Sequence, residues 1–112
     1  MSRSDRDRLL DVLEAATAID GHLDRGPLSD GLVFDAVRVR LIEIGEAVKD
    51  VSPGLLSRQP TIPWRQVAAM RDQLAHRYFD TSHAIVAQTV GSDLVELLAA
   101  TRSLLAALDT EG

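Results

Sequence analysis

Four stripes of apolar residues run along the chain, each with the spacing of three or four positions that marks one face of a helix. They occupy roughly residues 9–19, 33–48, 67–78 and 85–108, with charged residues between the apolar positions. The strict alternation typical of a strand is weak throughout. Because the connections are short, neighbouring helices should pack antiparallel, and we predict an all-α, up-and-down bundle of four to five helices.

Residues that favour helix ends separate the stripes. Gly21 and Gly26-Pro27 should end the first helix, and Pro63 favours the first turn of a third helix that continues to about Phe79. Gly91 favours a break in the last stripe, because glycine costs about 1 kcal/mol relative to alanine inside a helix. The predicted N-caps are Asp5, Ser29 or Asp30, and Asp80 or Thr81. No linker is left between the stripes, so a single domain should span residues 1–112.

The composition limits where the chain can work and what it can bind. Its 112 residues suit one domain, and the absence of cysteine excludes disulfides and thiolate chemistry. No apolar run approaches the roughly 18 to 20 residues of a membrane span, so we expect a soluble, cytoplasmic protein without membrane partners. A net charge of -5 argues against a general nucleic-acid coat, whose affinity comes from many phosphate contacts.

Arginine is nevertheless concentrated in one segment of this acidic chain. Between residues 58 and 78 the sequence has four arginines and one acid, namely Arg58, Arg65, Arg71 and Arg77 against Asp72. Guanidinium groups offer planar donors that match phosphate oxygens. The segment therefore predicts a local basic patch for RNA, with Arg65 and Arg77 as binding residues.

A helix over residues 64–79 would divide this segment into two faces. The predicted core face carries Val67, Met70, Leu74 and Tyr78, and the opposite face carries Arg65, Ala69, Asp72 and His76. Asp72 and His76 are one turn apart, so the carboxylate can orient the imidazole and favour its charged form. Arg71 lies at the margin beside Tyr78, about 140° around the helix from His76.

These residue types suit RNA cleavage without a metal ion. A histidine can take the proton of a 2′-hydroxyl, the freed oxygen attacks its own phosphorus, and arginine stabilises the developing negative charge. One chain supplies one such histidine, whereas a symmetric dimer supplies two, as a base and an acid. Taken alone, the spacing also fits a charged helix face that is merely solvated, which is the commoner meaning of such a pattern.

Three segments together resemble the HepT branch of the HEPN superfamily. They are Val39-Arg-Leu-Ile-Glu-Ile-Gly-Glu-Ala47, Pro60-Thr-Ile-Pro-Trp-Arg65 and Met70-Arg-Asp-Gln-Leu-Ala-His-Arg-Tyr-Phe79, in that order and at suitable separations. The likeness extends from the second predicted helix to the fourth. One departure stands early in the fourth helix, where members often carry tryptophan and this chain has Ile85 and Val86.

The resemblance implies a HEPN-like bundle that acts as a homodimeric, metal-independent endoribonuclease, the toxin of a toxin–antitoxin pair. The family's catalytic arginine and histidine correspond to Arg71 and His76, and its supporting polar residue corresponds to Asp72. The family's tyrosine corresponds to Tyr78, to which a minimal nucleotidyltransferase antitoxin attaches AMP in HepT systems. The expected partners are therefore RNA, this antitoxin and a second copy of the chain.

Other interpretations stay open at this stage. The chain could be a non-catalytic helical partner or substrate of a nucleotidyltransferase, which its acidity favours, or a structural bundle without a site. No cofactor is expected, and no metal site either, since no two of the three histidines have the spacing of ligands on one helix face. His83 is a candidate for a second catalytic histidine, Trp64 should be a packing anchor, and Arg40 and Glu46 could border a dimer cleft.

Overall fold

A computed structural model of the chain describes residues 4–76 and 79–111, with the backbone alone for 79–82 and 111. Every element within these ranges is helical, which confirms the predicted all-α bundle. The elements are α1 (Asp5–Arg25), α2 (Gly31–Lys49), α3 (Pro53–Leu56), α4 (Trp64–His76), α5 (Phe79–Gln88), the π-helical segment η1 (Thr89–Asp93) and α6 (Leu94–Glu111).

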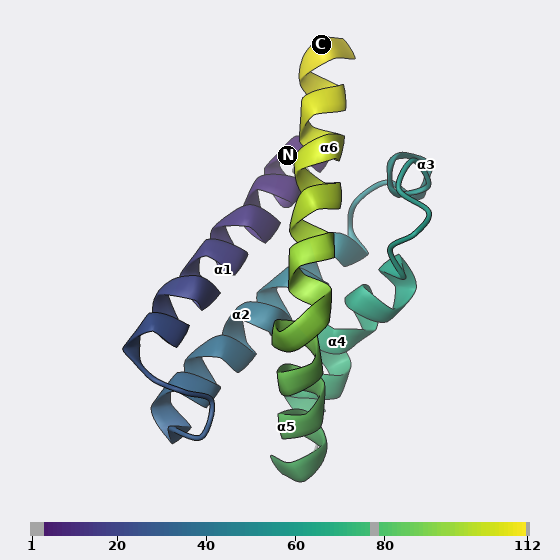
Figure 1. Ribbon diagram of the computed structural model, residues 1–112. Coiled ribbons are helices and arrows are strands. Elements are labelled where there is room, and N and C mark those ends of the chain that lie inside the picture. The colour runs from purple at the N-terminus through teal and green to yellow at the C-terminus, as the bar shows by residue number, and fades with distance from the viewer. Residues whose placement is uncertain (1–3, 77–78, 112) are drawn as a thin grey trace.

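Helix α2 lies at the centre of the bundle. It packs against α1 on one side and α4 on the other, and α5, η1 and α6 form one long rod that crosses the three helices (Figure 1). The fully buried side chains come from the stripes expected from the sequence and include Leu9 and Val12 of α1, Val37, Leu41 and Ile44 of α2, Leu74 of α4 and Leu104 of α6. The apolar faces therefore meet in one core, as the helical spacing predicts.

The helix ends follow local capping chemistry, with two corrections. Gly21 was predicted to help end the first helix, but it lies inside α1, which continues to Arg25 and has Gly26 as its C-cap. Asp30 caps α2 as predicted, since its carboxylate accepts from the backbone of Leu32 at 2.9 Å. The predicted cap Asp5 is wrong for α1: Ser4 holds that position and forms a reciprocal capping box with Asp7. The Asp5 carboxylate instead accepts from the backbone N–H of Ser52 at 3.0 Å, which ties the start of α1 to the residue that precedes α3.

The fourth predicted helix begins earlier in the chain than expected. Helix α5 already includes Phe79, so the predicted caps Asp80 and Thr81 lie inside α5. The predicted end of the third helix near Phe79 falls beside residues 77 and 78, which lie outside the described ranges. Tertiary contact overrides the local signal here: the ring of His83 stacks on Phe34 of α2, with centroids 5.1 Å apart, and packs the early part of α5 onto the core.

The predicted break at Gly91 is wrong, because the chain stays helical through a wider turn. Gly91 lies within η1, where the backbone follows π-helical geometry. The Thr89 hydroxyl donates to the Ile85 carbonyl oxygen at 2.8 Å, so a carbonyl at the entry to the wide turn keeps a hydrogen-bond partner. A π turn thus accommodates the glycine without interrupting the rod.

The rod is long and apolar by composition. Its part from His83 to Thr110 is long enough to cross a membrane and has a mean hydropathy of 1.3 over its most apolar window. The same part also supplies Val86, Leu97 and Leu104 to the core, each less than 5% exposed. Burial against α1 and α2 gives these apolar side chains a role within the bundle.

Candidate functional site

Helices α2 and α4 approach each other closely at Gly45, next to Arg71. A methyl group at Gly45 would lie 2.8 Å from the backbone nitrogen of Arg71 and 3.1 Å from the carbonyl oxygen of Val67. Both are backbone atoms of α4 and cannot move out of the way without moving the helix. The absent side chain of Gly45 therefore sets the distance between the two helices that carry the site.

Arg71 is held at this crossing by carboxylates from two helices. Its Nε donates to Glu46 of α2 at 3.0 Å, and its Nη1 donates to the Asp72 carboxylate at 2.8 Å. The hydrogen bond to Asp72 and the charge of Glu46 raise the pKa of Arg71, and the bond from Arg71 lowers the pKa of Asp72. Arg71 and Asp72 are therefore both charged at neutral pH.

His76 lies on the exposed side of the last turn of α4, as predicted. Its Nδ1 is 3.1 Å from the backbone carbonyl oxygen of Asp72. A carbonyl oxygen can only accept, so this bond requires the proton on Nδ1 and leaves Nε2 as the acceptor of a neutral ring. The geometry thus points a proton acceptor into solvent.

The Asp72 carboxylate has a hydrogen-bond partner that the sequence did not predict. We expected it to orient the imidazole of His76, but its oxygen binds Arg71, and the ring is oriented by the main chain of the same residue. A guanidinium forms a strong, charge-assisted hydrogen bond with a carboxylate, which accounts for this pairing. Arg71 and His76, which the sequence placed on different sides of the helix, therefore both contact Asp72. Arg71 binds its carboxylate, and the His76 ring binds its main-chain carbonyl.

A second arginine fastens the end of α4 to α2. The Nε of Arg38 donates to the backbone carbonyl oxygen of Leu74 at 2.9 Å, in a half-buried position. Carbonyl oxygens towards the C-terminal end of a helix carry partial negative charge, so a guanidinium stabilises this part of α4. Arg38 thereby supports the turn of α4 that presents His76.

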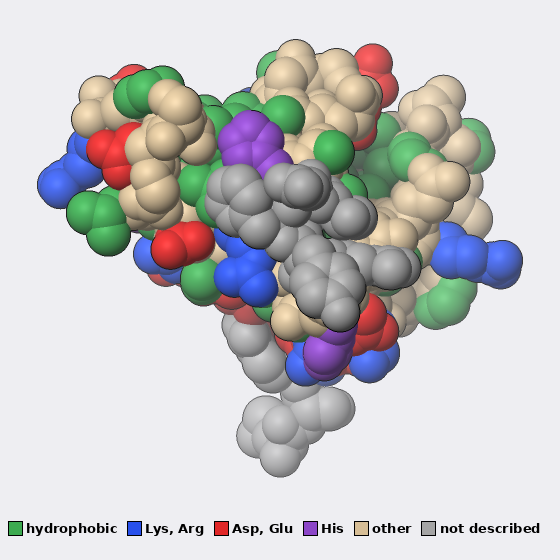
Figure 2. Space-filling model, turned by 90° about the horizontal axis from the view of Figure 1, so that it is seen from below, with side chains coloured by type: hydrophobic (Ala, Val, Ile, Leu, Met, Phe, Trp, Pro, Cys, Tyr) green, Lys and Arg blue, Asp and Glu red, His purple; other side chains and the backbone are tan. Residues whose placement is uncertain are grey.

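The remaining predicted residues are only partly brought together. Arg65 is exposed on the outer face of α4, about 10 Å along the axis from Asp72. Arg77 and Tyr78 lie outside the described residues. On the side of the molecule seen in Figure 2, basic side chains outside the grey atoms are interspersed with acidic ones. No hydrogen bond joins Arg71 to His76 in the part of the chain that the structure describes.

The predictions for His83 and Trp64 have different outcomes. The His83 ring lies nearly parallel to that of Phe34, at 7°, which gives it a packing role. Trp64 is half-buried and its indole N–H donates to the Gln59 carbonyl oxygen at 3.0 Å, which confirms it as a packing anchor. The stacking on Phe34 does not place the His83 ring beside His76.

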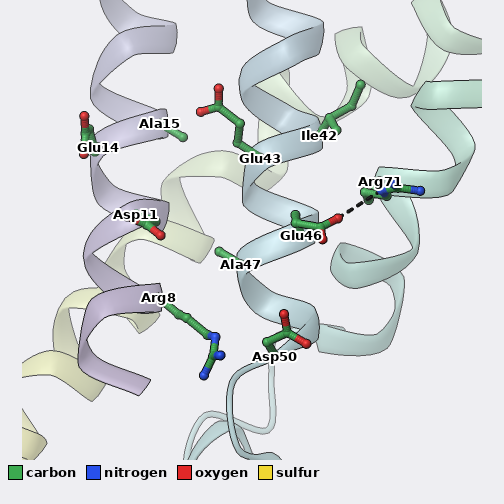
Figure 3. A pocket seen from close by; sticks show the side chains of 10 residues that line it. All are labelled: Arg8, Asp11, Glu14, Ala15, Ile42, Glu43, Glu46, Ala47, Asp50 and Arg71. Atoms are coloured by element: carbon green, nitrogen blue, oxygen red, sulfur yellow. Dashed lines mark hydrogen bonds and ion pairs between the residues drawn. The ribbon is translucent and has the colours of Figure 1, made fainter. Parts of the chain in front are cut away.

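A groove of about 560 Å³ opens between α1 and α2 and reaches Arg71 (Figure 3). Its charged lining consists of five acids, Asp11, Glu14, Glu43, Glu46 and Asp50, and two arginines, Arg8 and Arg71. Carboxylates repel a phosphate backbone. The groove side of Arg71 is therefore unfavourable for RNA.

Two contributors to the site were not assigned from the sequence. Glu46 was considered only as a surface residue or the border of a dimer cleft, and Gly45 only as part of a resemblance. A signal was present: a glycine on the buried stripe of α2 lowers helix propensity and so indicates a close approach. The sequence could not say which helix makes that approach.

Comparisons with known proteins match nearly the whole chain. The pattern of a family described as ribonuclease HepT-like matches residues 9–104. The protein named "Probable ribonuclease HepT" of Thermococcus cleftensis is 35% identical over 101 residues, or 87% of this chain and 92% of that protein. A candidate RNase of Caldanaerobacter subterraneus is 38% identical over 60 residues, 53% of this chain and 54% of that protein. No solved structure matches the chain significantly.

Proposed function

The chain belongs to the HepT-like ribonuclease family, and we propose that it is a metal-independent endoribonuclease, the toxin of a toxin–antitoxin pair. The observation that carries the proposal is the exposed, charged end of α4, where Arg71 and His76 stand in the order and spacing of the family's pattern. We place its action in the cytoplasm, where RNA substrates are present.

The proposed reaction is an internal attack on the RNA backbone. Nε2 of His76 takes the proton of a 2′-hydroxyl, and the oxygen forms a new bond to the adjacent phosphorus while the bond to the 5′-oxygen breaks. The leaving oxygen takes up a proton from a second acid. Arg71 donates hydrogen bonds to the phosphate oxygens, whose negative charge grows in the transition state. The products would be a 2′,3′-cyclic phosphate and a 5′-hydroxyl.

We propose that the second proton donor comes from a second copy of the chain. Arg71 and His76 are five positions apart on one helix and therefore point about 140° apart. A symmetric dimer would place two α4 ends together and supply two imidazoles, a base and an acid. The dimer would also bring together arginines from both copies, whereas a single chain has its arginines interspersed with acidic residues.

The test of this proposal is incubation of the purified protein with a mixed RNA pool in EDTA. Cleavage should proceed at the same rate with and without the chelator, because the proposed chemistry uses only histidine and arginine. Loss of cleavage in EDTA, restored by a divalent cation, would show a metal-dependent reaction and contradict the proposal.

We propose further that a minimal nucleotidyltransferase silences the toxin by attaching AMP to Tyr78. The chain has one tyrosine, so tyrosine modification has a single possible acceptor. An adenylyl group two residues from His76 would add bulk and a negative phosphate beside the arginines. Co-expression with the nucleotidyltransferase should add mass in units of AMP to the wild type and none to Tyr78→Phe. Equal added mass in both proteins would rule out Tyr78 as the acceptor.

The acidic groove favours one alternative, in which the chain is a non-catalytic helical partner of the nucleotidyltransferase. Five carboxylates beside Arg71 oppose RNA and would suit a basic protein surface instead. A stable complex of the two unmodified proteins, together with no cleavage of any RNA by the isolated chain, would support this alternative over the ribonuclease.

A further inference from the structure

We infer that Glu46 of α2 is a positioning residue that fixes the guanidinium of Arg71 for phosphate binding, an inference that rests on the proposed ribonuclease function. An arginine side chain on a helix surface has many rotamers, and freezing it costs conformational entropy. A reaction that needs the guanidinium in one place is faster when this entropy has been lost before the substrate binds.

Two hydrogen bonds in different directions define the plane of this guanidinium. Nε donates across the helix interface to Glu46, and Nη1 donates to Asp72 on the same helix. Within the described ranges, neither of these bonds uses Nη2. Nη2 is therefore left to donate to a phosphate oxygen, while Nε and Nη1 hold the side chain in place.

The contribution of Glu46 differs from that of Asp72 because it comes from another helix. Asp72 moves with Arg71 on α4, so their bond alone cannot set where the guanidinium lies in the molecule. Glu46 follows Gly45, whose missing side chain lets α4 come within contact distance of α2. The packing of α2 against α4 therefore determines how the Arg71 guanidinium is oriented.

Stability alone is a weak reason for this ion pair. The side chains of Arg71 and Glu46 are 41% and 55% exposed, and exposed pairs contribute little to folding. The same carboxylate also opposes RNA by its charge. A positioning role gives this pair a function that offsets both disadvantages.

The chain offers a matched control for Glu46. Glu43 lies on the same helix, lines the same groove and carries the same charge. It pairs with Arg40 at 3.1 Å, not with Arg71. Replacing either glutamate removes one negative charge near the site, but only the change at Glu46 releases Arg71.

The experiment compares RNA cleavage by Glu46→Ala and Glu43→Ala. Both variants should lower KM to a similar extent, since each removes one charge that repels RNA. Only Glu46→Ala should also lower kcat, by roughly ten- to a hundredfold, the range expected when a reacting group is misplaced. Glu46→Gln keeps a neutral acceptor and should recover part of kcat. Equal kcat values for the two alanine variants would overturn the inference.

A second measurement does not depend on activity. The Nε–H signal of Arg71 in an NMR spectrum, assigned with Arg71→Lys, should be protected from exchange in the wild type and in Glu43→Ala. It should be lost in Glu46→Ala. An unchanged signal in Glu46→Ala would overturn the positioning role. If the wild type cleaves no RNA, the proposed function fails, and this signal still decides whether Glu46 holds Arg71.

Discussion

Replacing His76 by alanine is expected to lower RNA cleavage by roughly a hundredfold or more while leaving the fold intact. A positioned general base or acid typically contributes 10² to 10⁴ in rate, and the proposed reaction has no other base on this chain. The ring is exposed and its described bond is to a main-chain carbonyl, so its loss removes no core packing. The measurement is the single-turnover rate on one RNA, with circular dichroism to verify the fold.

Two further variants separate catalysis from the mere presence of histidine. His83→Phe keeps the ring stacked on Phe34 and should cleave like the wild type. Mixed dimers of wild type and His76→Ala keep only one of the two imidazoles that the proposed site uses, so they should cleave at well below half the wild-type rate. Full activity of His76→Ala, or its loss only in His83→Phe, would show that the catalytic histidine has been assigned wrongly.

The substitution Gly45→Ala should destabilise the protein although alanine is the better helix former. The added methyl group would lie 2.8 Å from the backbone nitrogen of Arg71, so α2 and α4 must separate. Overpacking of this kind costs about 1–3 kcal/mol, and the gain in helix propensity offsets about 1 kcal/mol of it. We expect a lower urea midpoint and a loss of cleavage, since the separation also pulls Glu46 from Arg71.

Gly21→Ala is the matched control for this effect. Gly21 lies within α1, and a methyl group there would meet nothing within 4 Å. The same substitution should therefore raise stability by roughly 0.5–1 kcal/mol through helix propensity alone. If Gly45→Ala also stabilised the chain, the close approach of α2 and α4 could not be what Gly45 provides.

The general architecture was predictable because it depends on a repeated signal. Many apolar positions at helical spacing point to the same core, so the misplacement of one boundary does not change the result. Met70 and Leu74 are buried, and Asp72 and His76 are exposed, as the helical wheel of α4 predicts. The break at Gly91 was mispredicted because propensity alone cannot distinguish an interrupted helix from a π turn.

The connections within the site were less predictable because they are decided between helices. A wheel treats α4 alone and pairs Asp72 with His76, the neighbour one turn away. In the structure Nη1 of Arg71 binds the Asp72 carboxylate, and Nε of Arg71 binds Glu46, which lies 25 positions earlier in the chain. Such a choice depends on the distance between α2 and α4, which no single-helix pattern contains.

The ends of the cleaved RNA test the central claim most directly. If His76 and Arg71 promote attack by the 2′-hydroxyl, cleavage in EDTA must leave a 2′,3′-cyclic phosphate on one fragment and a 5′-hydroxyl on the other. Mass spectrometry of the fragments from one defined RNA distinguishes these ends from those of hydrolysis by water. A 3′-hydroxyl with a 5′-phosphate, or no cleavage until a metal is added, would contradict the proposed chemistry.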